Sequence, residues 1–177
     1  MKTCRGKLAL ALSYTGLIYA SLPFTRTPLR MLRRAAGETA LNAGVNIFLV
    51  AAFFGIFFFV LKGKHRFRQA FVFLAVSFIF ALFIKRLNLP EERIHFLEYG
   101  LCGVLYMNAF ESGETSSPGR KISWAFAAAA LAGIIDELIQ KILPSRVFDL
   151  RDILFNVVAG AGGVVIKKWA LNLNSIK

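Results

Sequence analysis

Long apolar runs constrain the fold of this chain more than any other feature. The run from Phe48 to Leu61 contains no polar side chain at all. Such uniform runs are too long for the core of a soluble domain of 177 residues, whereas a membrane-spanning helix needs about 17–25 mainly apolar residues. Backbone groups in lipid must be satisfied within their own segment, so these runs predict helices. The sequence therefore predicts an all-α integral membrane protein.

Composition and charge narrow the class further. The chain is 56% hydrophobic and only 18% charged, which excludes disordered, collagenous and disulfide-rich secreted proteins. Its two cysteines, Cys4 and Cys102, provide neither a disulfide framework nor a metal-binding spacing. The net charge is +12, but the basic residues cluster between apolar segments. Basic residues in such positions determine the orientation of membrane helices and contact anionic lipid headgroups. No nucleic-acid recognition motif accompanies them, so we expect no nucleic-acid partner.

Six segments have the length and apolarity of spanning helices, with proline- and glycine-containing connectors between them. We predict one membrane domain over residues 1–177, a polytopic bundle with spans at about 7–24, 41–61, 69–87, 93–110, 122–143 and 153–171. The first segment also has the basic start of a signal peptide, but the multispanning chain that follows favours a spanning helix. Arg26–Glu38 is expected to form a loop or a basic helix on the membrane surface.

The distribution of basic residues predicts the orientation. An even number of spans places both termini on one side of the membrane. Under the six-span reading, twelve lysines and arginines lie on the side of the termini and ten on the other. Because cytoplasmic loops carry the excess of basic residues, we expect the termini in the cytoplasm of a bacterial inner membrane.

Ionisable side chains within spans mark candidate functional sites, because each costs about 2.5–3.5 kcal/mol on insertion scales. Four acids qualify, and all are predicted near the same membrane face: Glu98, Asp136, Glu137 and Asp152. A short turn closed by Pro144 joins the fifth and sixth segments, so these helices must pack as an antiparallel hairpin.

Spacing groups further polar residues with these acids. His95, Glu98 and Tyr99 fall at i, i+3 and i+4, on one stripe of the fourth segment. Gln140 lies four residues after Asp136, and Asn156 lies four after Asp152. The predicted binding site comprises His95, Glu98, Tyr99, Asp136, Glu137, Gln140, Arg146, Asp152 and Asn156. A structural network of these same groups is the plainer alternative. Small residues give two segments a thin face for close helix packing: Gly100 and Gly103 on the fourth, and Ala159 and Gly163 on the sixth.

The same residues carry a resemblance to a known family. Asp136-Glu137-x-x-Gln140, then Pro144-Ser145-Arg146, then Asp152-x-x-x-Asn156 with Gly160 resembles the C-terminal signature of the VanZ-like family. His95-Phe96-x-Glu98-Tyr99 with Gly103 resembles its earlier motif, and Ser21-Leu22-Pro23 its N-terminal mark. This chain departs from the family where an acid and a lysine often precede the histidine, because Glu91 and Glu92 occupy those positions. Residues 41–87 look like two helices added to the shortest members.

The resemblance implies a bacterial cell-envelope protein with a role like that of teicoplanin-resistance proteins, but it implies no reaction. We predict an accessory protein whose outward-facing site binds a lipid headgroup, a lipid-linked wall precursor or an amphiphilic glycopeptide. Arg146 suits a phosphate or carboxylate. We expect membrane lipids as partners and no cofactor.

Three alternatives stay open. In an intramembrane hydrolase or transferase acting on a lipid-linked substrate, His95 or Glu98 would be the general base, Asp136 its orienting partner and Arg146 the stabiliser of negative charge. No metal is assigned, although a divalent ion held by Glu98, Asp136 and Asp152 is chemically reasonable. A small transporter fits less well, because the acids are gathered at one face and no repeat is present. A purely structural role is the third.

Overall fold

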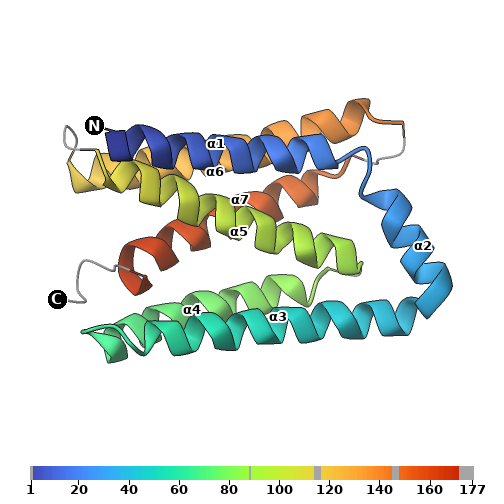
Figure 1. The fold of residues 1–177 in the computed structure, drawn as a ribbon, viewed down its shortest axis with the longest axis horizontal. Helices are drawn as coiled ribbons and strands as arrows, with labels where there is room; N and C mark the ends of the chain where they lie inside the picture. Colours follow the sequence, from blue (N-terminus) through green and yellow to red (C-terminus); the bar gives the residue numbers. More distant parts are fainter. Residues whose placement is uncertain (1, 88, 114–116, 145–147, 172–177) are drawn as a thin grey trace.

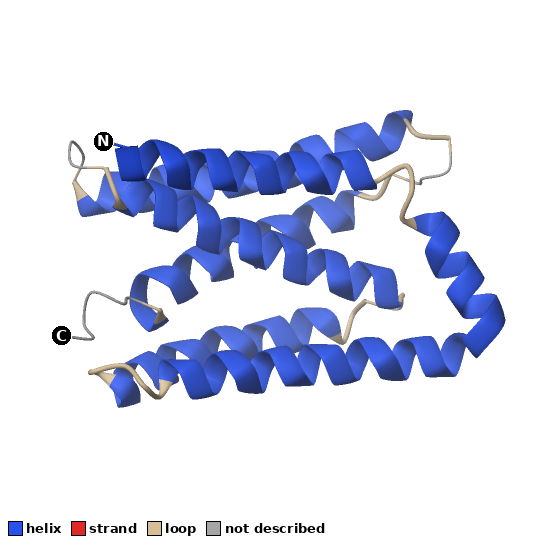
Figure 2. Cartoon of the chain, viewed as in Figure 1, coloured by secondary structure: helices blue, strands red, loops and turns tan. Residues whose placement is uncertain are grey.

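The computed structural model describes residues 2–87, 89–113, 117–144 and 148–171, and within these ranges every regular element is helical (Figures 1 and 2). The elements are α1 (Lys2–Ser21), α2 (Arg26–Ala36), α3 (Glu38–Val60), α4 (Arg66–Ile84), α5 (Pro90–Glu111), α6 (Pro118–Ile142), α7 (Leu150–Val165) and a π-helical turn, η1 (Ile166–Ala170). The all-α prediction is confirmed. The six predicted spans correspond to α1, α3, α4, α5, α6 and α7 with η1, with ends displaced by a few residues.

The span count itself stays a prediction. Four described helical segments are long and apolar enough to cross a membrane: α3, α4, α6, and α7 continued through η1. Helices α1 and α5 have the length but are less apolar. Helix α1 begins with basic residues, and α5 carries Glu92, Arg93, His95 and Glu98 near its start. Both helices nevertheless contribute to the buried core, with Ala11 and Ile18 from α1 and Tyr99 and Met107 from α5.

Of the two alternatives for Arg26–Glu38, a loop or a basic helix, the structure has a helix, α2. It is strongly amphipathic, and it crosses the end of the bundle to connect α1 to α3 (Figure 1). Its last turn carries Arg33 and Arg34, which suit the C-terminal end of the helix dipole. Gly37, with φ of 84°, allows the sharp change of direction into α3.

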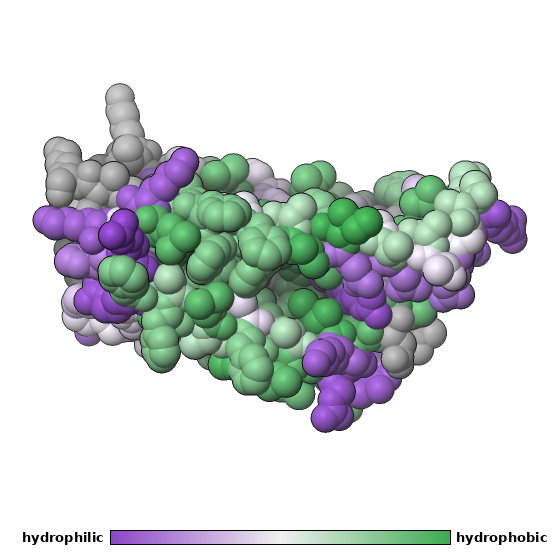
Figure 3. All heavy atoms as spheres, turned by 90° about the horizontal axis from the view of Figure 1, so that it is seen from below, coloured by the Kyte–Doolittle hydropathy of each residue, from purple (hydrophilic) through white to green (hydrophobic). Residues whose placement is uncertain are grey.

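Helices α1, α5, α6 and α7 form the main bundle, and α3 with α4 forms a hairpin along one side of it (Figure 1). The hairpin packs through phenylalanine rings, with Phe53 and Phe73 centroids 5.3 Å apart. Its outer face exposes Phe48, Phe58 and Phe78. In the view from below, an apolar band covers the middle of the molecule and hydrophilic residues gather towards both ends (Figure 3). This distribution is that of a protein in a bilayer.

Glycine lets the backbones of α5 and α7 touch. A Cβ added to Gly103 would collide with the carbonyl oxygen of Gly160, and one added to Gly163 would collide with that of Gly100. The small residues predicted a closely packing face on each helix, and the structure shows that these two faces pack on each other. On the C-terminal side of this contact between α5 and α7, Lys167 and Lys168 of η1 both pair with Glu111 at the end of α5, at 3.2 and 2.9 Å.

The helix directions place one set of connections together. The C-terminal ends of α1 and α6 and the N-terminal ends of α5 and α7 meet at the end of the bundle opposite the chain termini (Figure 1). The predicted turn that contains Ser145 and Arg146 lies outside the described residues. The polar residues near these four helix ends are therefore brought to one membrane face.

Candidate functional site

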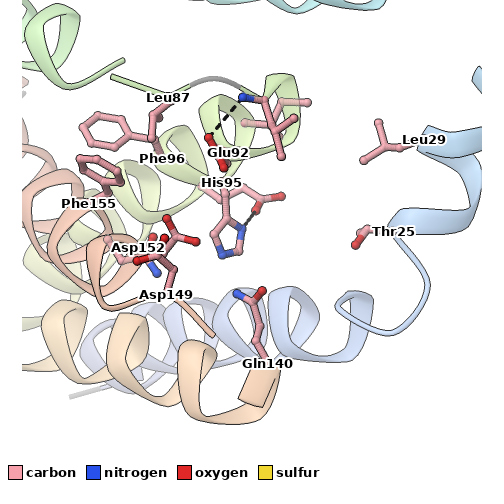
Figure 4. A pocket seen from close by; sticks show the side chains of 14 residues that line it. Thr25, Leu29, Leu87, Glu92, His95, Phe96, Gln140, Asp149, Asp152 and Phe155 are labelled. Atoms are coloured by element: carbon pink, nitrogen blue, oxygen red, sulfur yellow. Dashed lines mark hydrogen bonds and ion pairs between the residues drawn. The ribbon is translucent and has the colours of Figure 1, made fainter. Parts of the chain in front are cut away.

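A cavity of about 310 Å³ opens at this end of the bundle, and we refer to it as the end cavity (Figure 4). Its wall combines apolar side chains with a set of polar groups rich in acids. The lining residues are Thr25, Leu29, Leu87, Leu89, Glu92, Ile94, His95, Phe96, Glu98, Gln140, Asp149, Asp152, Phe155 and Asn156. They come from α2 and its N-cap, the connection between α4 and α5, and helices α5, α6 and α7, so the cavity depends on how these elements pack together.

His95 links two helices at the wall of this cavity. It lies in the second turn of α5, where Glu98 follows one turn later on the same face. Its Nδ1 is 2.9 Å from Glu98 Oε2, and its Nε2 is 2.8 Å from Asp136 Oδ2 on α6. The imidazole is thus held between two carboxylates, one on its own helix and one on the neighbour.

Gln140 extends this network along α6. Its Nε2 donates to Asp136 Oδ2 and to Glu137 Oε1, at 2.7 Å each. Asp136 and Glu137 have no exposed surface, so the amide supplies a hydrogen bond that water cannot. We call His95, Glu98, Asp136, Glu137 and Gln140 the acid–histidine cluster. It contains three carboxylates and one imidazole.

Two oxygens of the cluster have no hydrogen-bond partner among the described residues, namely Asp136 Oδ1 and Glu137 Oε2. Buried polar atoms are normally paired, so each unpaired oxygen requires a specific explanation. His95, Asp136 and Glu137 each offer a ligand atom within 4.8 Å of the others, which makes them the described residues best placed to hold a metal ion.

Nearby arginines are engaged elsewhere. Arg93 donates to the Leu87 carbonyl and to Asn46 Oδ1 of α3. Arg151 pairs with Asp149 Oδ2 at 2.6 Å, and this bonding holds the pKa of the Asp149 carboxyl below its usual range. Arg146 lies outside the described residues. Within the described part of the chain, His95 is therefore the basic side chain that contacts the carboxylates of the cluster.

Helix α7 brings further acids to the end cavity. Asp149 caps the helix by accepting a hydrogen bond from the Arg151 backbone N–H at 2.8 Å. Asp152, in the first turn, also lines the cavity and lies near Asp149 and His95 in Figure 4. A carboxylate in the first turn is favoured by the helix dipole. With Glu92 and Glu98, four acids line the cavity.

Two of the predicted site residues make structural contacts. Asn156 Nδ2 donates to the Gly133 carbonyl of α6 at 3.4 Å, and only glycine fits there, because an added Cβ would lie 2.6 Å from Asn156 Cβ. Tyr99 donates to the Ala132 carbonyl at 3.5 Å, and its ring packs edge-on against His95 with centroids 5.1 Å apart. Asn156 lines the cavity. Tyr99 is not among the lining residues and contacts the His95 ring.

The structure thus joins five of the nine predicted residues in one network. Among the described residues, Asp152 and Asn156 line the same cavity without a hydrogen bond to that network, and Tyr99 packs against the His95 ring. The ninth predicted residue, Arg146, lies outside the described residues. Sequence reasoning missed Thr25, Glu92 and Asp149 as lining residues. Two of them had a local signal, since Asp149 is a typical N-cap residue and Glu92 bonds the Leu89 N–H in a capping pattern. Thr25 had none.

Comparison with known proteins supplies a family for this region. Residues 91–171 match the family model described as VanZ/LLP1. The match begins in the first turn of α5 and ends just after η1, so it includes α5, α6 and α7 and all nine predicted site residues. No curated protein and no solved structure matches the chain.

Proposed function

We propose that this chain, a VanZ-like membrane protein over residues 91–171, binds the polar headgroup of a membrane amphiphile in the end cavity. The observation that carries the proposal is the acid–histidine cluster in the wall of a cavity that four acids line. Charged groups in a membrane protein are costly, so their concentration at one cavity favours a ligand there.

The charge of the cavity suggests which headgroups fit. Glu92, Glu98, Asp149 and Asp152 line it, and among the described residues Arg151 is paired with Asp149 rather than directed at the cluster. A headgroup carrying an amine and hydroxyl donors complements these acceptors. Leu29, Phe96 and Phe155 in the same wall offer apolar surface to the adjoining part of an amphiphile. A lipid headgroup, a lipid-linked wall precursor and an amphiphilic glycopeptide such as teicoplanin share this chemistry.

Replacing Asp152 with asparagine tests the proposal. We expect binding of phosphatidylethanolamine to the detergent-purified protein to weaken about tenfold, because one charge-assisted hydrogen bond contributes about 1.5–3 kcal/mol. Native mass spectrometry would measure lipid retention, with phosphatidylglycerol as the probe without an amine and teicoplanin as the third ligand. Glu38→Gln, at the start of α3, is the control. Equal retention of both phospholipids, with no effect of Asp152→Asn and no teicoplanin binding, would remove the headgroup proposal.

One observation favours an enzyme as the second candidate. An imidazole held between Glu98 and Asp136 has the arrangement of a general acid–base group with an orienting carboxylate. Incubating the purified protein with an isoprenyl-diphosphate-linked sugar and following it by thin-layer chromatography tests this. Product formed by the wild-type protein and lost in His95→Gln would support the hydrolase or transferase.

The orientation proposal has a separate test. We propose a bacterial inner membrane location with both termini cytoplasmic and the end cavity at the outer face. In a background lacking Cys4 and Cys102, a cysteine at Ser145 should react with an impermeant maleimide added to intact cells, and a cysteine at Ser117 should not. The reverse pattern would invert the orientation, and labelling of both would contradict the six-span topology.

A further inference from the structure

We propose that His95, Asp136 and Glu137 bind a divalent transition-metal cation of the Zn²⁺ or Mn²⁺ type. This inference goes beyond headgroup binding, and its test uses the metal alone. One ligand comes from α5 and two consecutive ligands come from α6, so the site would join the two helices at the wall of the end cavity.

The distances suit one cation. Ligand atoms of the three residues lie within 4.8 Å of one another. Two atoms that ligate the same Zn²⁺ at about 2.0–2.2 Å are separated by at most about 4.4 Å. Small side-chain rotations therefore bring all three atoms into a first coordination sphere. One imidazole nitrogen with two carboxylates is a ligand set that Zn²⁺, Mn²⁺ and Fe²⁺ accept.

Two unpaired carboxylate oxygens among the described residues favour binding of a cation at the cluster. Asp136 Oδ1 and Glu137 Oε2 are buried without a partner among the described residues, and both side chains have no exposed surface. Two adjacent carboxylates in such a place are unfavourable unless a cation lies close to them. Among the described contacts, His95 bonds Asp136 through Nε2 and does not bond Glu137. A divalent ion would satisfy both oxygens together.

The surrounding hydrogen bonds match those found around metal ligands. Glu98 accepts from Nδ1 of His95 at 2.9 Å, which fixes the ring and directs Nε2 towards Asp136. A ligating histidine usually donates its other N–H to a carboxylate in this way. Gln140 holds one oxygen of Asp136 and one of Glu137. When the cation binds Nε2, it replaces the proton shared with Asp136 Oδ2, and that proton leaves to solvent.

The position beside the cavity gives the ion a role. His95 and Gln140 line the end cavity, so an ion at the cluster would keep a coordination position open towards it. Such a position accepts a phosphate or carboxylate oxygen. If the proposed headgroup binding also holds, a zwitterionic headgroup would place its phosphate on the ion and its amine near Asp149 or Asp152.

Metal binding to the whole chain tests the inference. The tag-free protein in detergent micelles would be stripped with a chelator and titrated with Zn²⁺ or Mn²⁺ by calorimetry, with bound metal counted by mass spectrometry. We expect about one ion per chain and an affinity lowered at least about tenfold in Glu137→Gln and in Glu98→Gln. Glu38→Gln is the matched control, because this exposed acid lies at the start of α3, outside the end cavity and the proposed ligand set. Binding below about a tenth of an ion per chain, or equal affinity in all variants, would overturn the site.

A spectroscopic measurement keeps the inference testable if Glu137→Gln does not fold. The chain has two histidines, His65 and His95, and His65 lies in the exposed connection between α3 and α4. Electron spin-echo spectra of Mn²⁺ bound to the wild-type protein should show coupling to one imidazole nitrogen, and the signal should persist in His65→Gln. Loss of the signal in that variant, or its absence from the wild-type protein, would contradict ligation by His95.

Discussion

Replacing Gly163 with alanine is expected to destabilise the folded protein by about 3 kcal/mol or more, the upper range for overpacking. The added Cβ would collide with the carbonyl oxygen of Gly100, and its next neighbours are also backbone atoms. A flexible side chain could move aside, but a helix backbone can do so only by separating α5 from α7. Gly103→Ala should behave in the same way, because its Cβ would meet the Gly160 backbone. Thermal unfolding in detergent micelles measures the change.

The chain offers matched controls for this prediction. Gly44 and Gly55 of α3 have no atom within 4 Å of an added Cβ, so alanine there should be neutral or stabilising by up to about 1 kcal/mol. Gly100 has only ordinary contacts, at 3.7 and 3.8 Å, and its alanine variant should be tolerated despite being one turn from Gly103. If Gly163→Ala and Gly55→Ala melt at the same temperature, the backbone contact of α5 and α7 is wrong.

His95→Gln is expected to cost about 3–5 kcal/mol, the usual effect of removing one partner from a buried charged pair. Within the described residues, His95 is the basic side chain that bonds the carboxylates of the cluster. Asp136, which it bonds through Nε2, has no exposed surface. Chemical denaturation or melting in micelles measures the loss. The headgroup binding assay should fail in the same variant, because the ring also forms part of the cavity wall.

A second variant distinguishes loss of charge pairing from loss of shape. Adding Asp136→Asn to His95→Gln removes the unpaired carboxylate, so the double variant should be more stable than His95→Gln alone. His65→Gln, in an exposed connection, should change stability by less than about 0.5 kcal/mol. A double variant no more stable than His95→Gln would show that the imidazole supports packing rather than charge.

The sequence predicted the helices well because membrane insertion depends on properties carried by each segment alone. Runs such as Phe48–Leu61 identify a helix without any knowledge of its neighbours. Glycines at helical spacing predicted a close-packing face on both α5 and α7, but not that these two faces meet, which depends on the arrangement of the whole bundle. The lower apolarity of α5 has a reason visible in the fold, because Glu92, His95 and Glu98 near its start line the end cavity.

The site was predictable only as far as single helices determine it. The three-residue spacing of His95 and Glu98 predicted their contact, and the four-residue spacing of Asp136 and Gln140 predicted another. The 2.8 Å approach of His95 to Asp136 depends on how α5 and α6 are rotated against each other, which no local pattern specifies. Tyr99 shares the helix stripe of His95 but bonds the Ala132 carbonyl of α6. This contact also depends on how α5 and α6 are rotated against each other. The pairing of Glu111 with Lys167 and Lys168 joins residues 56 and 57 positions apart and had no signal.

The burial of Asp136 and Glu137 has a consequence for biosynthesis. Leu138 and Ile142 on the opposite side of α6 are exposed, so the helix presents lipid with one face while carrying two acids on the other. Insertion of α6 alone into the membrane would cost about 2.5–3.5 kcal/mol of free energy for each acid. Helix α5 precedes α6 along the chain, so His95 is synthesised 41 residues before Asp136. We therefore expect α6 to insert as a pair with α5, whose imidazole supplies a partner to the buried acids, rather than alone.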